Sequence, residues 1–250
     1  MWTRLIPAAE LAASPSWKPD FFCSDGHAVR ISHHRLLPIG EVVRDRGESA
    51  DPLVLANRAA HYIGLEDVEP ITGRLLAVRT CGEIGVRSRS KTFSKDDILY
   101  GRLRPSLNKV YLAGRVVPRG LCSNEFLVLV PDRAKVVPAY LRSIISTGFV
   151  TDLVPSRLGG SALPRLPLEQ LLSIEVPIPT IATQERIARI LTSRLERHAR
   201  LAELMASFPE ALMSDLAVSL ETDRPAPVRS EVLDLSIGHD IQDLYHGSSL

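Results

Sequence analysis

Between residues 36 and 180, short apolar runs alternate with turn-forming residues, a pattern typical of short strands joined by turns. Two stretches differ, because the apolar positions of 138–147 have the spacing of a buried helix face and 168–172 predicts a single helical turn. Together these patterns predict one mixed α+β domain. Its expected strands lie at 36–43, 61–65, 73–78, 97–103, 108–113, 125–130 and 173–179.

The pattern changes after residue 180, since residues 183–206 contain no glycine or proline and are rich in Ala, Leu, Arg and Glu. Thr183 is placed to cap the start of a helix whose apolar positions recur at helical spacing. Arg194 or His198 interrupts every heptad register, so we expect a long amphipathic spacer helix with an imperfect seam. The seam residues expected to contact a partner helix are Ile187, Ile190, Leu191, Leu195, Leu201, Leu204 and Met205.

The helical region is expected to cover 181–221 as two helices. Ser207 and Glu210 have the spacing of a capping box, and Pro209 lies where the first turn of a new helix tolerates proline. On either side of the domain and helices, we predict an irregular N-terminal extension over 1–35, with a short hairpin at 21–31, and a flexible acidic tail over 222–250.

Charge is distributed unevenly along the chain, although the formal net charge is only +1. Residues 79–119 hold ten bases and three acids, a net +7, whereas residues 203–250 hold nine acids and two bases, a net −7. Such polarity favours a polyanionic partner for the first segment. Within it, "YGRLRPSLNK" at 100–109 contains three cations and no acid. Charge alone leaves two interpretations of this run, a solvated surface loop and an anion-binding site.

Composition and motifs favour a binding module over an enzyme. The three cysteines, Cys23, Cys81 and Cys122, form no CxxC pair, which argues against a disulfide framework or a metal site and for the thiols of a cytoplasmic protein. No apolar run approaches the ~20 residues that cross a bilayer, so no membrane partner is expected. GxGxxG, the P-loop pattern, HExxH and the Asp/Glu-x-Lys pattern of many nucleases are missing, and no cofactor is predicted.

Five segments, in this order, resemble the target recognition domain of type I restriction–modification specificity subunits. The resemblance covers about residues 36–205 and ends in a strand, a proline pair, a Gln and a long helix. The segments are "YIGLEDVEPITGRLL", "FSKDDILYGRLRPSLNKVYLA", "GLCSNEFLVLVP", "YLRSIISTGFV" and "GGSALPRLPLEQLLSIEVPIPTIATQERIARIL".

The resemblance implies a non-catalytic subunit whose α+β domain reads a few base pairs of double-stranded DNA. It also implies that the spacer helix packs against another such helix and docks a DNA methyltransferase subunit, with a restriction subunit as a further partner. A full subunit of this family has two recognition domains and two spacer helices, and this chain has room for one of each. We therefore expect a half-subunit that forms a homodimer and reads two inverted half-sites. Thr180 and Ala182 depart from the usual proline-rich closing phrase, and residues 1–35 have no counterpart in the family.

The DNA-contacting residues are expected in two clusters. Arg87, Arg89 and Lys91 lie in a polar run with no evident packing role, so we expect them to read bases. Arg102, Arg104, Asn108 and Lys109 lie where the family has its Arg-Pro…Lys phrase, and cations there would neutralise phosphates. For Arg104, which precedes a proline, a role in bracing the fold is an equal alternative.

A second hypothesis, from a different class of protein, explains the same helix. An interaction protein that imitates a specificity subunit would bind the methyltransferase through its helix without reading DNA. Salt-dependent DNA binding separates the two hypotheses, because only the DNA reader requires it.

Overall fold

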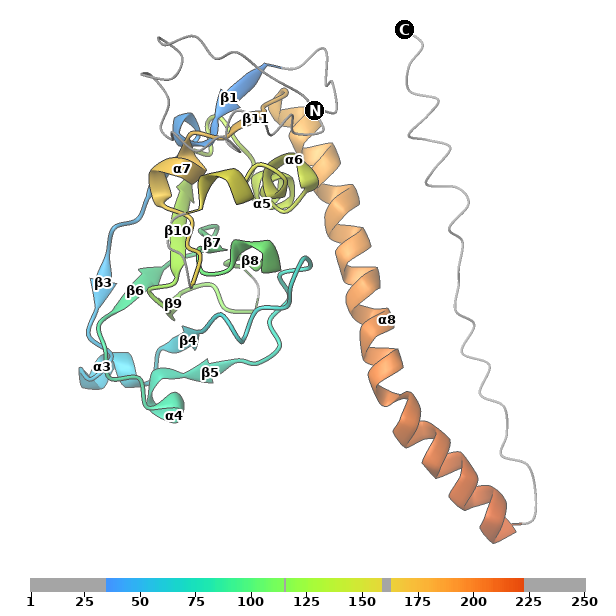
Figure 1. Ribbon diagram of the computed structural model, residues 1–250. Helices are drawn as coiled ribbons and strands as arrows, with labels where there is room; N and C mark the ends of the chain where they lie inside the picture. Colours follow the sequence, from blue (N-terminus) through green and yellow to red (C-terminus); the bar gives the residue numbers. More distant parts are fainter. Residues whose placement is uncertain (1–34, 115, 159–162, 223–250) are drawn as a thin grey trace, which may run out of the picture. The chain divides into compact units, whose positions relative to one another are not determined.

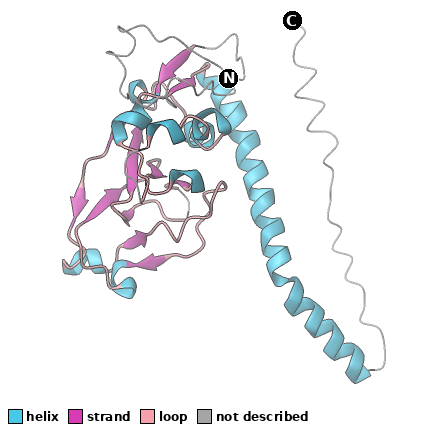
Figure 2. Ribbon diagram, viewed as in Figure 1, coloured by secondary structure: helices cyan, strands magenta, loops and turns pink. Residues whose placement is uncertain are grey.

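The computed structural model describes residues 35–114, 116–158 and 163–222 (Figure 1). The expected hairpin at 21–31 and acidic tail lie outside these residues, apart from Thr222. The chain divides into two units, residues 1–199 and 200–250, and the sheets lie in the first. Sheets and helices are both present, as expected for an α+β domain followed by a long helix (Figure 2).

The described residues of the domain form three sheets, and all of the strand pairs in these sheets are antiparallel except the parallel pair β4–β9. A two-stranded sheet pairs β1 (Leu36–Pro38) with β11 (Glu175–Pro177). The four-stranded sheet has the order β2 (Val43–Asp45), β10 (Phe126–Pro131), β7 (Ile98–Gly101), β8 (Val110–Leu112). The five-stranded sheet has the order β3 (Ser49–Ala50), β6 (Ser90–Phe93), β9 (Gly120–Cys122), β4 (His61–Ile63), β5 (Arg79–Thr80).

Among the described residues, most of the helices are short and α8 is the one long helix. The short α-helices are α3 (Leu55–Arg58), α4 (Cys81–Ile84), α5 (Pro138–Ile145), α6 (Gly148–Thr151) and α7 (Leu168–Leu172). Three single turns of 3-10 helix are η1 (Ile39–Glu41), η2 (Pro105–Leu107) and η3 (Pro155–Arg157). The long helix α8 covers Ile181–Thr222, and no helix among the described residues is long and apolar enough to cross a membrane.

Strand β10 separates two hydrophobic cores. Because successive side chains of a strand point to opposite faces, its apolar run divides between them. Leu127 and Leu129 belong to the core that includes α5, α7 and β11, whereas Phe126 and Val128 belong to the core shared with β4, β6 and β9. Burial on both faces explains why this strand is an uninterrupted hydrophobic run instead of an alternating one.

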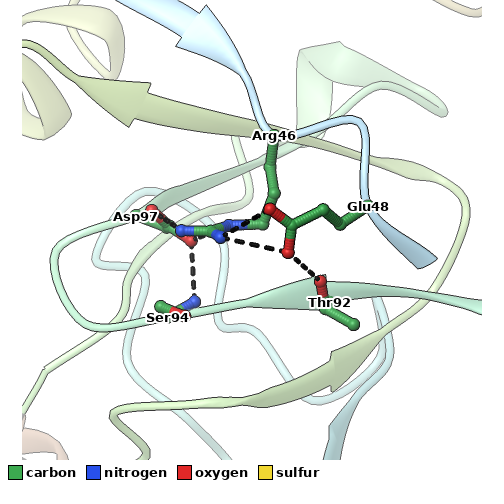
Figure 3. Close-up of polar contacts among 5 residues, drawn as sticks. All are labelled: Arg46, Glu48, Thr92, Ser94 and Asp97. Carbon is green, nitrogen blue, oxygen red and sulfur yellow. Dashed lines mark hydrogen bonds and ion pairs between the residues drawn. The ribbon is translucent and has the colours of Figure 1, made fainter. Parts of the chain in front are cut away.

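An ion pair joins two of the connections between the four-stranded and five-stranded sheets, β2–β3 and β6–β7 (Figure 3). Arg46 follows β2, and its guanidinium donates to the two carboxylate oxygens of Asp97 at 2.6 and 3.0 Å. Asp97 lies in the β6–β7 turn and also accepts from the backbone N–H of Ser94 at 2.7 Å. Glu48 lies 3.4 Å from Arg46 and accepts from Thr92 of β6 at 3.4 Å. These contacts hold the β2–β3 and β6–β7 connections against each other.

A buried arginine holds the loop between β4 and β5. Arg142 of α5 donates to the carbonyl oxygens of Val110 and Ile71 at 3.1 Å each, and to that of Thr72. Burial lowers the pKa of Arg142 to about 10. Gly73 is required beside it, because its φ is +65° and a Cβ there would lie 1.9 Å from the carbonyl oxygen of Val110.

Helix α8 is joined to the domain by Gln184. The buried amide accepts from the backbone N–H of Val137 at 2.8 Å and donates to the carbonyl oxygens of Pro179 and Lys135 at 2.8 and 3.1 Å. One side chain thus ties the first turn of α8 to the residues that precede α5. Ala188, one turn further along α8, is buried in the core that includes α5, α7 and β11.

Two expectations about the helical region were wrong. The cap is Thr180 instead of Thr183, because the Thr180 hydroxyl accepts from the backbone N–H of Thr183 at 3.4 Å and the helix begins at Ile181. The helix also continues through Pro209 without a second start. The Ser207 hydroxyl, expected in a capping box, donates to the carbonyl oxygen of Leu204 at 3.0 Å. A serine that bonds back to the preceding turn is typical of a helix interior.

The strand expected at 73–78 was also wrong. Only a single bridge, Val68–Leu75, forms there, and the strand β5 begins at Arg79. The positive φ of Gly73 and the hydrogen bonds of Arg142 keep the start of this segment in a loop conformation, whatever its apolar content. Leu76 and Val78 are exposed as a result.

Candidate nucleic-acid interface

Arg89 and Asn124 lie opposite each other at one end of the five-stranded sheet. Strands β6 and β9 pair Lys91 with Cys122, and continuing this antiparallel register by two residues places Arg89 across from Asn124. The Asn124 amide donates to the carbonyl oxygen of Arg89 at 2.9 Å, so the two residues are in contact just beyond the strand ends. Both side chains are exposed. The sheet therefore presents an arginine and an asparagine side by side to solvent.

The run 87–91 is not the unstructured polar loop that its composition predicts. Strand β6 begins at Ser90, which is buried. Arg89 donates to the hydroxyl of Ser49 at 2.7 Å and to its carbonyl oxygen at 3.0 Å, and the Lys91 ammonium donates to the carbonyl oxygen of Phe126 at 2.7 Å. These side chains hold neighbouring strands together as well as carrying charge, and Arg87 is exposed.

Helix α4 fixes the start of this run. Thr80 and Glu83 form a capping box, in which the Glu83 carboxylate accepts from the Thr80 backbone N–H at 2.7 Å. The helix ends at Gly85, whose φ of +70° closes the last turn. The exposed residues that follow thus project from a defined turn.

One carboxylate beside this pair, that of Glu125, is paired with an arginine and lies near two further cations. Arg165 donates to the two oxygens of Glu125 at 2.7 and 3.0 Å. These hydrogen bonds hold the pKa of the Glu125 carboxyl below its ordinary value, and the nearby charges of Arg102 and Lys91 lower it further. The cluster therefore keeps an excess of positive charge after Glu125 is paired.

The second predicted cluster divides into one exposed residue and three that are partly enclosed. Arg104 is exposed at the start of η2 with a φ of 46°, an uncommon conformation for a residue other than glycine. Asn108 donates its amide to the carbonyl oxygen of Ser146 at 2.7 Å, and Lys109 donates to that of Leu65 at 2.8 Å. Arg102 lies partly buried beside Glu125, with its Nε enclosed. Asn108 and Lys109 thus brace the fold.

Sequence reasoning missed Arg165, Asn124 and Glu125. Arg165 joins the cluster because the chain around it pairs with the Arg-Pro segment, through the bridge Leu103–Arg165 and the bond from the Leu166 N–H to the Arg102 carbonyl at 2.9 Å. In the sequence, Arg165 is a single arginine between two prolines, and Asn124 and Glu125 directly precede an apolar strand. Neither pattern indicates that these residues come together.

The predicted seam of the long helix divides between two environments. Ile187 packs against the domain's own core, so it is not available to a partner helix. Ile190, Leu191 and Leu195 are half-buried. Within the second unit, Leu201, Leu204 and Met205 are 42%, 38% and 74% exposed. Among the described residues, no group of three or more His, Cys, Asp or Glu could hold a metal ion, and Cys81 and Cys122 are buried free thiols.

Comparison with known proteins agrees with this architecture. Residues 83–204 match the family model described as "Type I restriction modification DNA specificity domain". The chain is also 30% identical over 181 residues to the type I restriction enzyme EcoDI specificity subunit of Escherichia coli, an alignment that covers 68% of this chain and 39% of that protein. The chain belongs to the type I restriction–modification specificity family.

Solved structures show the same fold for this specificity domain. The HsdS subunit from Thermoanaerobacter tengcongensis aligns with a TM-score of 0.56 at 21% identity, covering 74% of this chain and 48% of that one. A chain from a structure titled as the basis of complex assembly and conformational transition of the type I R-M system aligns with a TM-score of 0.57 at 22% identity, with the same coverage. This chain therefore spans less than half the length of each of these relatives.

Proposed function

We propose that this chain is the sequence-specific DNA-recognition subunit of a type I-like restriction–modification system. It directs a DNA methyltransferase, and with it a restriction nuclease, to a bipartite site on double-stranded DNA in the cytoplasm. The observation that carries the proposal is the excess of cations around Glu125, beside the exposed pair Arg89 and Asn124, in a domain of the specificity family.

The cations of this surface have two tasks. Arg102, Arg104 and Arg165 neutralise phosphates, which supplies affinity without sequence preference. Arg87 and Arg89 are exposed on a defined turn and read base edges, since an arginine binds guanine through two hydrogen bonds. Lys91, Asn108 and Lys109 hold strands and loops in place, and the two lysines add positive charge near the phosphates.

The subunit has no chemistry of its own in this proposal. Specificity subunits of type I systems recognise DNA, and the methyl transfer and the strand cleavage belong to other subunits. Purified alone, the chain neither methylates nor cuts DNA. Metal-dependent cleavage that co-purifies with the chain and disappears with a single acidic substitution would contradict this.

The second element of the proposal is a homodimer formed through α8. The exposed Leu201, Leu204 and Met205 form an apolar face that a partner helix would cover. A helix rises ~1.5 Å per residue, so antiparallel pairing of two α8 helices would separate two recognition domains by a distance that the overlap of the helices fixes. Each domain would read the same bases on opposite strands, giving two inverted half-sites around a gap of fixed length.

A binding experiment with salt variation tests the recognition role. The full chain is titrated with double-stranded DNA at increasing salt, as wild type and as Arg89→Ala and Arg133→Ala. We expect log K to fall by about 0.9 per phosphate contact for each unit of log salt. On its preferred DNA, Arg89→Ala weakens binding by ~1–3 kcal/mol if Arg89 reads a base.

Arg133 is the matched control because it lies beyond the far end of β10. That end is about 17 Å from the Glu125 end at the usual rise per residue, which exceeds the Debye length of ~8 Å at physiological salt. Arg133→Ala is therefore expected to leave binding unchanged. Binding without salt dependence would exclude the recognition role and favour a decoy that binds only the methyltransferase.

The dimer is tested by light scattering of the chain and of a Leu204→Glu, Met205→Glu variant. We expect a dimer that the charged variant converts to a monomer, together with an inverted bipartite site in methylation mapping of a host that carries the system. A wild-type monomer in the assembled complex, or an asymmetric methylated site with this chain as the sole specificity subunit, would contradict the symmetric arrangement.

A further inference from the structure

We propose that Asn124 is a specificity-determining residue that reads one adenine of each half-site. The inference rests on the proposed function, since it assigns a base to a side chain on the same surface. The sequence directs attention to Asn108 instead, but that residue is half-buried, its Oδ1 is enclosed and its amide donates to the carbonyl oxygen of Ser146. Asn124 is exposed, contacts Arg89 and directly precedes Glu125.

The backbone at Asn124 is held before any ligand binds. It lies in the turn that takes the chain from β9 of one sheet to β10 of the other, closed by the Phe126 N–H on the carbonyl oxygen of Ser123 at 3.0 Å. The Ser123 hydroxyl accepts from the Glu125 N–H at 3.2 Å, and the Ser123 N–H donates to the carbonyl oxygen of Ile63 at 3.0 Å. A side chain on such a turn keeps a narrow range of positions, which base discrimination requires.

The amide of Asn124 is also oriented. Its Nδ2 donates one hydrogen to the carbonyl oxygen of Arg89 at 2.9 Å, and a carbonyl can only accept, so the oxygen and nitrogen of the amide are distinguished. Arg89 itself is fixed by its two bonds to Ser49. This is the one hydrogen bond of the Asn124 side chain to the described residues, so Oδ1 and the second N–H have no hydrogen-bond partner in that part of the chain.

An acceptor and a donor on one planar amide match adenine. In the major groove Oδ1 accepts from the N6 amino group while the N–H donates to N7, whereas guanine presents two acceptors there and cytosine a donor. The cations around Glu125 would hold the adjacent phosphates, which sets the distance of approach. The chemistry of the site thus selects adenine at the base that faces Asn124.

Selection from random double-stranded DNA with the full chain tests the assignment. We expect the wild-type chain to enrich a site in which adenine is preferred at one position of each half-site. Asn124→Ala should lose that preference, on the order of ten- to hundredfold, and keep the preferences at other positions. Asn124→Asp, which removes the N–H donor and keeps an acceptor, should move the preference at the same position towards cytosine.

The outcomes distinguish the role of Asn124 from the DNA-recognition function of the whole chain. Enrichment of the same site by wild type and Asn124→Ala, or a uniform loss of binding at all positions, overturns the role of Asn124 and leaves the subunit a DNA reader. A wild-type chain that enriches no sequence overturns the recognition function and this inference together. A merely structural role for Asn124 would lower affinity or stability without altering the preference at one base.

Discussion

Replacing Gln184 by methionine tests how the long helix is attached to the recognition domain. Methionine keeps nearly the same volume and the buried position, so the change removes hydrogen bonds with little loss of packing. Three bonds disappear: the one that Gln184 accepts from the Val137 N–H and the two that it donates to the carbonyl oxygens of Lys135 and Pro179.

The structure allows the cost to be estimated. A buried N–H left without an acceptor costs about 1–3 kcal/mol, and each lost bond to a carbonyl adds roughly 0.5–1.5 kcal/mol, because a carbonyl has a second lone pair and relaxes more easily. We expect Gln184→Met to lower the free energy of unfolding by about 2–6 kcal/mol, a large part of the ~5–15 kcal/mol of a typical domain.

Urea unfolding followed by circular dichroism measures the change, and amide hydrogen exchange at Val137 locates it. Arg186→Met is the matched control: it introduces the same residue two positions away at an exposed site, where we expect less than about 0.5 kcal/mol. A Gln184→Met chain that unfolds like the control, with unchanged protection at Val137, would refute the role of this amide in holding α8.

Three further changes test other contacts. Asp97→Ala leaves Arg46 with only the 3.4 Å contact to Glu48 and should destabilise the domain in urea by about 2–4 kcal/mol, somewhat below the ~3–5 of a fully buried pair because the Arg46 side chain is 13% exposed. Arg142→Met should loosen the β4–β5 loop, seen as faster amide exchange there with the sheets still protected. Because Arg165 lowers the pKa of Glu125 from 4.5, the stabilisation from this pair is present above pH ~4.5 and is lost as pH falls through the lowered pKa. Glu125→Gln should therefore give a shallower loss of stability below pH ~4.5, and an unchanged slope would contradict the assignment.

The sequence by itself determined the elements whose signals are local. Apolar runs at β7, β8, β10 and β11 are strands in the structure, and the helical spacing after Val137 is α5. Burial on both faces gives β10 its continuous hydrophobic run, and the absence of glycine and proline over 183–206 favours one long helix. The family was also evident, because five ordered segments carry it without knowledge of their contacts.

The tertiary structure alone decided which polar residues of the basic segments are exposed and which hold the fold together. Lys91, Asn108 and Lys109 resemble their exposed neighbours in composition, yet each donates to a backbone carbonyl at least 35 positions away. Arg165 reaches Glu125 across 40 positions, and Asn124 meets Arg89 across 35, through strand pairing that no local pattern encodes. A buried carbonyl needs a donor wherever the chain folds back on itself, and which side chain supplies it depends on the pairing of distant strands.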